Sequence, residues 1–231
     1  MQIHIRHYAA GAAEAADFAV IIDVFRAFSM ACYAFSHGAA KIIAVREVET
    51  ARQWKQSIPD CILVGERHAK KLPGFDFGNS PSEIQDADLS DRIIVHTTHS
   101  GTRALTAAAH ADPVITGSFV NCGAIIQYIQ QTAPSEVSLV CSGFEGREPA
   151  LEDTLCAEFI RDALCGQTKK SFEDIRKELK TADTARRFFD PEDTSSPATD
   201  FDLCLAFDRF PFVIRRTKTA SDWCELEREN L

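Results

Sequence analysis

Residues 21–45 read IIDVFRAFSMACYAFSHGAAKIIAV: an apolar run, a polar turn, a helical pattern and a second apolar run. The first run starts at residue 17 and ends in the carboxylate of Asp23, and residues 27–36 carry small and apolar side chains at helical spacing. Gly38 follows, which suits the position just after a helix end. The stretch therefore predicts a strand, a helix and a second strand, the unit from which parallel sheets are built.

The same order recurs along the chain. Residues 94–118 read IVHTTHSGTRALTAAAHADPVITGS, again an apolar run, a polar turn, an Ala-rich helix and an apolar run. Further strand patterns lie at 41–45, 61–64, 92–96, 113–116 and 137–141, and helical patterns lie at 47–57, 101–109, 121–131 and 150–164. Alternating strands and helices predict an α/β fold with three α/β/α layers and a mainly parallel sheet. The likeness of the two units suggests two similar duplicated subdomains.

The pattern weakens after residue 168. Charged helical segments at 170–180 and 184–189 precede a linker rich in Pro, Asp and Ser and a short apolar piece at 210–214. We therefore expect an α/β catalytic core at residues 1–168. Residues 169–231 are expected to pack on this core as a helical and strand segment, either a peripheral cover or a partner contact.

Composition excludes several classes of protein. Of the 231 residues, 45% are hydrophobic and 26% are charged, as in ordinary globular proteins, and no apolar run approaches the ~20 residues of a membrane helix. The N-terminus lacks a signal-peptide pattern and the eight cysteines form no CxxC pair, which favours a cytoplasmic protein with reduced thiols. The net charge of −9 argues against nucleic acid as a partner. A small-molecule ligand is expected, and a homodimer stays open.

One long loop has no helical or strand period. Residues 65–81 read GERHAKKLPGFDFGNSP, and ordered loops of this length are uncommon unless they have a function. Asp76 lies between two glycines, so it is either a turn former or a ligand to Mg²⁺ and its waters. Asn79 and Ser80 offer neutral hydrogen-bond groups just before Pro81.

Polar and charged residues suited to binding or catalysis follow the carboxyl ends of the predicted strands. The turns after the strands carry hydroxyls, glycines, arginines and carboxylates, whereas the opposite ends carry Gly38, Pro59 and Pro113. Ligands of open parallel sheets bind outside the carboxyl ends of the strands, so we expect the site there. The candidate residues in these turns are Asp23, Arg26, Glu66, Arg67, Thr98, Ser100, Gly101, Thr102, Ser118 and Asn121.

Two groups of these residues suit an anionic ligand. Residues 97–102, TTHSGT, open a helix whose N-terminus could hold a phosphate or a sulfonate; the alternative is a cluster of helix caps. Arg26 and Arg67 can each fork onto an oxyanion; the alternative is a salt bridge to Asp23 or to Glu66.

The carboxylates suit a metal ion. Mg²⁺ prefers oxygen ligands, and the candidates are Asp23, Glu66, Asp76, Glu152 and Asp153. For Glu152 and Asp153 the alternative is favourable placement in the first turn of a helix. Asp23 is the candidate for the catalytic carboxylate because it ends a strand close to Arg26.

Six motifs together resemble the 2-phosphosulfolactate phosphatase family. They are DVFRAFS at 23–29, GER at 65–67, GFDFGNSP at 74–81, TTHSGT at 97–102, GSFVN at 117–121 and CSGFEGREPALED at 141–153. The resemblance covers about residues 17 to 165, and GFDFGNSP is its most specific piece. The chain departs from the family pattern at Phe28, His68-Ala69 and Ser100.

The resemblance implies a Mg²⁺-dependent phosphatase of the coenzyme M route that converts 2-phospho-3-sulfolactate to 3-sulfolactate and phosphate. Asp23, Arg26 and Asp76 are then expected to be catalytic. The expected metal-binding residues are Glu66, Asp76, Glu152 and Asp153. The expected substrate-binding residues are Arg67, Asn79, Ser80, Thr98, Ser100, Gly101, Thr102, Ser118 and Asn121. Two alternatives stay open: a phosphatase for another small phosphorylated acid, and an inactive anion-binding module of the same fold.

Overall fold

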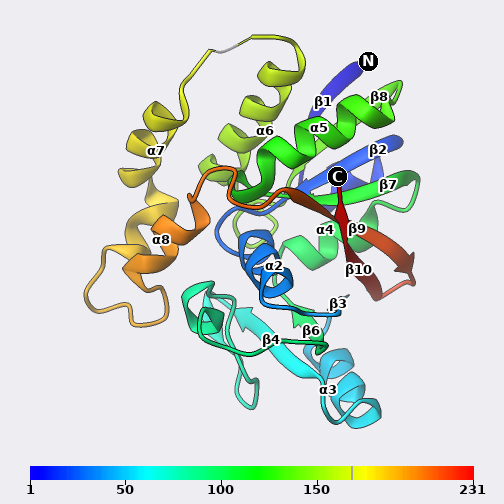
Figure 1. The fold of residues 1–231 in the computed structure, drawn as a ribbon. Coiled ribbons are helices and arrows are strands. Elements are labelled where there is room, and N and C mark those ends of the chain that lie inside the picture. Colours follow the sequence, from blue (N-terminus) through cyan, green and yellow to red (C-terminus); the bar gives the residue numbers. More distant parts are fainter. Residues whose placement is uncertain (168) are drawn as a thin grey trace.

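The computed structural model describes residues 1–167 and 169–231 (Figure 1). The strands are β1 (Gln2–His7), β2 (Asp17–Ile22), β3 (Lys41–Val45), β4 (Ile62–Arg67), β5 (Lys70–Lys71), β6 (Ile93–Thr97), β7 (Ala111–Gly117), β8 (Glu136–Cys141), β9 (Phe212–Thr219) and β10 (Trp223–Asn230). The α-helices are α1 (Tyr8–Ala13), α2 (Ala27–Ser36), α3 (Val48–Ser57), α4 (Gly101–Ala107), α5 (Cys122–Thr132), α6 (Leu151–Leu164), α7 (Phe172–Lys180) and α8 (Ala198–Cys204). Short 3-10 helices are η1 (Ser82–Ile84), η2 (Phe119–Asn121) and η3 (Asp183–Phe188).

The strands of the described residues form one ten-stranded sheet in the order β1-β8-β2-β7-β9-β10-β3-β6-β4-β5. Strands β1, β8, β2 and β7 pair in parallel, and so do β3, β6 and β4. The antiparallel hairpin of β9 and β10 joins these two parallel groups through β7 and β3. The sheet is thus mainly parallel, as predicted, but it consists of two parallel groups that run in opposite directions.

Alternation along β2 explains the layers. Phe18, Val20 and Ile22 belong to a buried cluster with residues of α5, α6, α7 and α8, whereas Ala19 and Ile21 belong to another with residues of α1, α2 and α4. Successive strand residues point to opposite faces, so each face of the sheet has its own helices. These clusters confirm the three-layer α/β fold.

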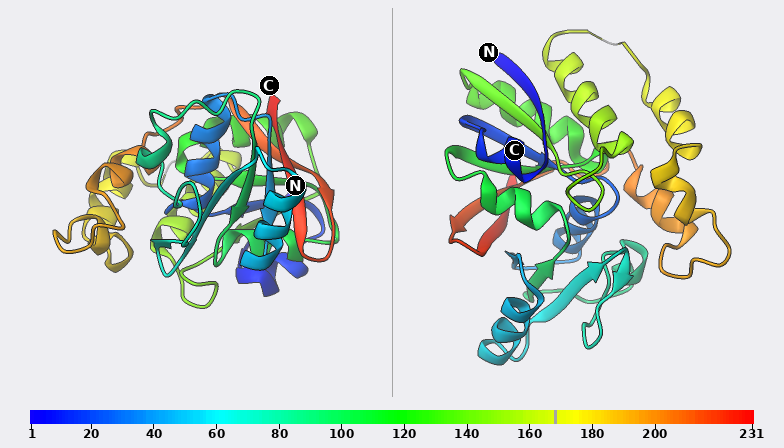
Figure 2. Two further views of the ribbon diagram at one scale, coloured as in Figure 1. Left: turned by 90° about the horizontal axis from the view of Figure 1, so that it is seen from below. Right: turned by 180° about the vertical axis from the view of Figure 1, so that it is seen from behind.

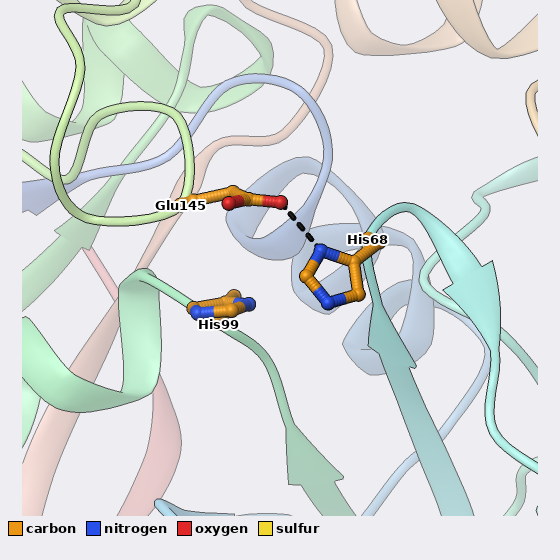
Figure 3. Close-up of side chains that lie close together, drawn as sticks. All are labelled: His68, His99 and Glu145. Carbon is orange, nitrogen blue, oxygen red and sulfur yellow. Dashed lines mark hydrogen bonds and ion pairs between the residues drawn. The ribbon is translucent and has the colours of Figure 1, made fainter.

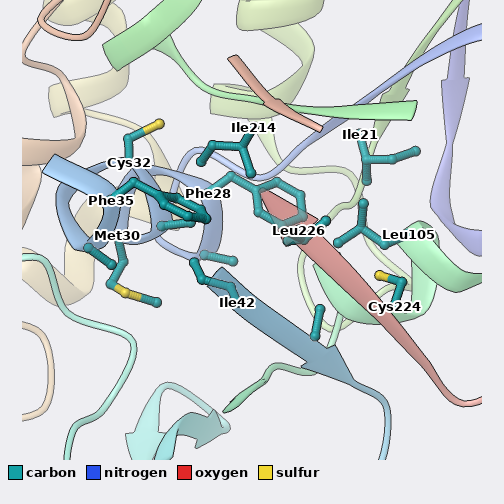
Figure 4. Packing of buried hydrophobic residues seen from close by; sticks show 14 of the residues in the cluster. Ile21, Phe28, Met30, Cys32, Phe35, Ile42, Leu105, Ile214, Cys224 and Leu226 are labelled. Carbon is teal, nitrogen blue, oxygen red and sulfur yellow. The ribbon is translucent and has the colours of Figure 1, made fainter. Parts of the chain in front are cut away.

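Helix α2 fills the centre of the molecule. Its residues from Ala27 to Phe35 are all buried, and Phe28 and Met30 share a cluster with Ile42 of β3, Ile214 of β9 and Leu226 of β10 (Figure 4). An amphipathic pattern is absent from this helix because it is covered on every side. This packing fixes the turn between β2 and α2, which carries Asp23 and Arg26.

The C-terminal segment differs from the sequence-based expectation. Strands β9 and β10 lie in the middle of the sheet, so the expectation of a peripheral cover is wrong for this hairpin. Helices α7 and α8 lie together at one side of the molecule (Figure 2). The boundary expected at residue 168 falls outside the described residues, and the duplication of two subdomains stays a prediction. Within the described part of the chain, no helix combines the length and the apolarity needed to cross a bilayer.

Candidate active site

A pocket opens where the turns after β2, β4, β6 and β8 meet the start of α6 and the 3-10 helix η3. It joins both parallel groups, because β2 and β8 belong to one and β4 and β6 to the other. The turn after β7 does not reach it. Eight of the residues predicted from the sequence line the pocket: Asp23, Arg26, Glu66, Asn79, Thr98, Ser100, Glu152 and Asp153.

The first turn of α2 holds the Asp23 carboxylate. Its Oδ1 accepts a hydrogen bond from the Ala27 N–H at 3.1 Å. Its Oδ2 lies beside the start of α4, where a Cβ on Gly101 would come within 2.9 Å of it. Only glycine allows this approach. Within the described residues, no group donates a hydrogen bond to Oδ2, so this oxygen is available to a ligand.

Asp153 and Glu66 are held by backbone amides. Asp153 accepts from the N–H of Val24 at 2.9 Å and of Gly143 at 3.0 Å, and so ties the turn after β2 to the turn after β8. Glu66 accepts from the N–H of Ala69 at 2.8 Å and of His99 at 3.1 Å. These bonds fix both carboxylates at the pocket.

Glu152 is buried beside Asp153 at the start of α6. Its Oε2 accepts a hydrogen bond from the Thr184 hydroxyl at 2.6 Å, which links α6 to η3. Its Oε1 accepts none from the part of the chain that the structure describes. Glu152 therefore combines a fixed orientation with one available oxygen, as Asp23 does.

Burial dominates the electrostatics of the carboxyl groups at the pocket, and their crowding adds to it for Asp23 and Asp153. Burial raises the pKa of Asp23 to about 7, and the neighbouring Glu66 and Glu152 add to the effect. Burial, Asp23 and Glu152 raise the pKa of Asp153 well above its ordinary value, and burial also raises the pKa of Glu152. The carboxylates of the pocket thus carry more negative charge than the surrounding groups compensate. Either bound protons or a bound cation would neutralise this excess charge.

The donor set fits Mg²⁺. This ion prefers carboxylate and water oxygens and keeps several waters, so one or two direct protein ligands suffice. The unpaired oxygens of Asp23 and Glu152 are the best direct ligands. Glu66 and Asp153, whose oxygens already accept amide hydrogen bonds, are better placed to orient the waters around an ion.

Arg26 lines the pocket, but its guanidinium is committed to the protein. Its Nη1 lies 2.9 Å from Oδ2 of Asp200 in a buried ion pair and donates to the Ser195 carbonyl at 3.0 Å, and its Nη2 donates to the Ala69 carbonyl at 3.0 Å. For Arg26, the structure therefore favours the salt-bridge alternative over the expected binding of a substrate oxyanion. The partner of Arg26 is Asp200 rather than Asp23, because α8 packs with Asp200 against the turn between β2 and α2.

Arg187 of η3 also lines the pocket. Its Nη2 donates to the Phe25 carbonyl at 2.8 Å, which fixes the guanidinium at the pocket. Its Nε is buried and has no partner within the described residues. Such an unpaired buried donor is costly unless a ligand completes it, so Arg187 is the best candidate for binding an oxyanion.

Asn79 is oriented by a buried histidine. Nε2 of His96 lies 3.0 Å from Oδ1 of Asn79, and burial together with Arg67 lowers the pKa of His96 to about 3. The neutral imidazole therefore donates to the Asn79 oxygen. This arrangement leaves the amide NH₂ group of Asn79 as a neutral donor at the pocket.

The TTHSGT segment lines the pocket and also caps the start of α4. Thr98 and Ser100 line the pocket. The Thr98 hydroxyl also accepts a hydrogen bond from the Thr102 N–H at 3.3 Å, and the Thr102 hydroxyl donates to the Thr98 carbonyl. Thr102 is therefore part of the helix cap rather than of the pocket lining, and Gly101 acts through its close approach to Asp23.

The remaining predicted residues lie outside the pocket. Arg67 donates to the Thr97 hydroxyl and to the carbonyls of Glu66 and Arg46. Oδ2 of Asp76 accepts from the Leu63 N–H at 2.8 Å and lies 3.8 Å from Nζ of Lys55, and the side chain is 45% exposed. This geometry gives Asp76 a structural role, in which its carboxylate ties the long loop to β4.

Three of the predicted hydroxyl and amide groups are also structural. The Ser80 hydroxyl donates to Asp200 at 2.8 Å. Ser118 and Asn121 form the capping box of η2, and the Ser118 hydroxyl lies 2.6 Å from the Ser29 hydroxyl. All three side chains are buried.

Five residues at or beside the pocket had not been predicted: His68, His99, Glu145, Arg187 and Asp200. His68, His99 and Glu145 stand in strand-end turns, which was the available signal. Arg187 and Asp200 come from the C-terminal segment, where charged helices and a polar linker give no sign of burial.

Comparison with known proteins identifies relatives over most of the chain. Residues 4–218 match the family model described as 2-phosphosulpholactate phosphatase. A protein of Deinococcus radiodurans named "Probable 2-phosphosulfolactate phosphatase" is 37% identical over 149 residues, which cover 64% of this chain and 62% of the relative. A protein of Bacillus subtilis with the same name is 29% identical over 202 residues, 87% of each chain. A third protein of that name, from Thermotoga maritima, is 38% identical over 142 residues, 62% of this chain and 60% of the relative.

Proposed function

Because this chain belongs to the 2-phosphosulfolactate phosphatase family, we propose that it is a Mg²⁺-dependent phosphoric monoester hydrolase that converts 2-phospho-3-sulfolactate to 3-sulfolactate and phosphate. The observation that carries the proposal is the pocket itself. Four carboxylates from Asp23, Glu66, Glu152 and Asp153 meet there with Arg187, whose Nε has no hydrogen-bond partner within the described residues.

The polar groups of the pocket suit a small substrate with several anionic ends. Arg187 offers a charged donor, Asn79 an amide, and Thr98 and Ser100 hydroxyls. These donors would bind and orient the phosphate, sulfonate and carboxylate oxygens. A bound Mg²⁺ would supply charge neutralisation at the phosphoryl oxygens and so allow a strongly anionic substrate into an acidic pocket.

Asp23 acts on the reacting centre in this proposal. Its Oδ1 is fixed by the Ala27 N–H, and its Oδ2 is held open by the absence of a side chain at Gly101. That oxygen is suited either to attack phosphorus or to accept a proton from the attacking water. Acid-quenched single turnover with ³²P-labelled substrate separates the two routes, because attack of Asp23 on phosphorus releases the sulfolactate alcohol and leaves the label on the protein as an aspartyl phosphate, whereas direct attack by water puts the label only in free phosphate.

A second candidate is hydrolysis of another small phosphorylated acid. It is favoured by His68 and His99, whose rings lie 5.5 Å apart at the pocket and add imidazole groups to its lining. An inactive anion-binding module is disfavoured because four carboxylates, which suit a catalytic metal ion and would repel an anion, line the pocket.

Phosphate release from a panel of substrates tests the proposal. The panel contains 2-phosphosulfolactate, phospholactate without the sulfonate, and a simple alkyl phosphate, each with excess Mg²⁺. We expect 2-phosphosulfolactate to have the highest kcat/KM. Preference for phospholactate would support the second candidate, and no phosphate release from any of them would support the inactive module. The cytoplasmic location and the place in coenzyme M synthesis stay predictions.

A further inference from the structure

Two histidines and a glutamate from three separate loops meet at the pocket (Figure 3). His68 follows β4, His99 lies between β6 and α4, and Glu145 lies between β8 and α6. One ring nitrogen of each histidine and one carboxylate oxygen all lie within 4.8 Å of one another. Nδ1 of His68 lies 2.6 Å from Oε1 of Glu145, and the two imidazole rings meet edge to face at 5.5 Å.

We propose that His68, His99 and Glu145 bind a divalent transition-metal ion of the zinc class. The inference is independent of the phosphatase activity proposed above. Two imidazoles and one carboxylate form the ligand set of three-ligand zinc sites, which leave a further coordination position open. Imidazole favours zinc and its transition-metal neighbours, whereas Mg²⁺ favours oxygen ligands, so this cluster differs in kind from the carboxylates around Asp23.

The local structure supports a ligand at this place. Nδ1 of His99 is buried and has no hydrogen-bond partner within the described residues. Backbone φ angles of 54° at His68 and 50° at Glu145 lie in the left-handed region, which is uncommon for residues other than glycine. The His99 N–H donates to Glu66, so its loop is fixed from the side of the carboxylates.

The distances require only small movements. Two ligands of a tetrahedral zinc ion at about 2.1 Å are about 3.4 Å apart, so the outermost atoms of the cluster would approach one another by about 1–1.5 Å. The His68 side chain is 70% exposed and that of Glu145 is 32% exposed, so both have room to turn. The ion would take the place of the hydrogen atom in the present hydrogen bond between His68 and Glu145.

A bound ion would connect the two halves of the sheet. His68 and His99 follow strands of the β3-β6-β4 group, whereas Glu145 follows β8 of the other group. Coordination would therefore hold the loops together across the pocket. The open coordination position would be available to water or to an anionic group of a ligand in the pocket, which all three residues line.

Cobalt titration of the full chain tests the proposal. The protein is treated with chelator, kept reduced and supplied with excess Mg²⁺, and Co²⁺ binding is followed by its visible absorption, with Zn²⁺ added afterwards as a competitor. We expect one Co²⁺ per chain with the spectrum of nitrogen coordination, displaced by Zn²⁺. His68→Ala and Glu145→Gln should each weaken binding at least about 100-fold, the upper end of the loss seen for groups that only support a metal ligand.

Three control variants exclude other sites. His110→Ala removes an exposed histidine that does not line the pocket. Cys165→Ser removes the exposed thiol, and Asp23→Asn alters the carboxylate cluster. All three should bind Co²⁺ as tightly as the unchanged protein, and circular dichroism checks that every variant is folded. Failure of the unchanged protein to bind Co²⁺ in the presence of Mg²⁺, or equal binding by folded His68→Ala, would overturn the proposal.

Discussion

Arg26 and Asp200 form a buried ion pair, with 2.9 Å between Nη1 and Oδ2 and side chains that are 2% and 0% exposed. Asp200 also accepts from the hydroxyl of Ser80 at 2.8 Å and from the N–H of Ser82 at 3.0 Å. The pair thus joins the turn after β2, the end of the long loop and helix α8. Through these contacts of Asp200, the C-terminal segment helps to hold the pocket residues in place.

Asp200→Ala should therefore destabilise the protein. Removing one partner of a buried ion pair leaves the other charge uncompensated and typically costs about 3–5 kcal/mol of unfolding free energy. Urea denaturation measures this loss. The matched control is Asp202→Ala, which removes an exposed pair with Arg176 and should cost less than about 1 kcal/mol. Equal effects of the two substitutions would show that the buried pair has no special role. Arg26→Ala should resemble Asp200→Ala, because it breaks the same buried pair.

Arg187→Gln should impair catalysis more than folding. Its unpaired Nε and its place at the pocket make it our candidate for binding an anionic group of the substrate. Loss of such a buried charged contact typically lowers kcat/KM by about 2–5 kcal/mol of transition-state stabilisation, or about 30-fold to several thousand-fold. Steady-state kinetics with 2-phosphosulfolactate measures the loss. Arg186→Gln is the control, because that side chain is 78% exposed and pairs with Asp183. An Arg187 variant as active as the Arg186 variant would assign Arg187 a structural role only.

Asp76→Asn and Asp23→Asn should have opposite outcomes. Asp76 accepts a hydrogen bond from the Leu63 N–H, which an Asn side-chain oxygen can also accept, so activity should stay within a few-fold of the unchanged protein. Asp23→Asn should lower kcat at least ~100-fold, the low end of what general acid–base groups contribute. Loss of activity in Asp76→Asn with an unchanged melting temperature would restore Asp76 to the catalytic residues.

The raised pKa of Asp23 makes the stability of the metal-free protein depend on pH. Between the ordinary value of 3.8 and about 7, the folded state keeps a proton that the unfolded state has released. The Asp23 contribution to the unfolding free energy is therefore complete below pH 3.8 and is lost as the pH rises through 7. Asp23→Asn carries no such charge. With chelator present, its melting temperature relative to the unchanged protein should be higher at pH 8 than at pH 5.

Asp76→Asn is the control for this pH effect because its side chain is 45% exposed. Its melting temperature relative to the unchanged protein should be the same at both pH values. If Asp23→Asn behaves in the same way, the pKa of Asp23 is not raised in the folded protein and its carboxyl is already ionised at pH 5. Addition of Mg²⁺ at pH 8 should stabilise the unchanged protein and have little effect on Asp23→Asn.

Much of the fold was predictable because the strands of the core follow simple patterns. The apolar runs around β2, β6 and β8 and the Ala-rich helices α2 and α4 have clear periods, so the α/β alternation could be read directly. β10, with the sequence WCELEREN, gave no such signal. It is buried at Cys224, Glu225 and Leu226, but the rest of the strand is largely exposed, so its composition is that of a surface segment.

The pocket was predictable only where its residues follow strands. Asp23, Glu66 and Thr98 stand at strand ends, and the rule for parallel sheets identifies them. Arg187 and Asp200 lie in a short 3-10 helix and in a seven-residue helix of the C-terminal segment. Their contacts with Phe25 and Arg26 span 162 and 174 residues, and no local pattern encodes such pairs.

Phosphate release from 2-phosphosulfolactate by chelator-treated protein, before and after addition of Mg²⁺, tests most directly whether the acidic pocket performs metal-dependent phosphatase chemistry. We expect no hydrolysis above background with excess chelator, full restoration by Mg²⁺, and no restoration of Asp23→Asn or Glu152→Gln, which lack the available carboxylate oxygens. Undiminished hydrolysis by the unchanged protein in excess chelator would contradict a role for Mg²⁺ at this pocket.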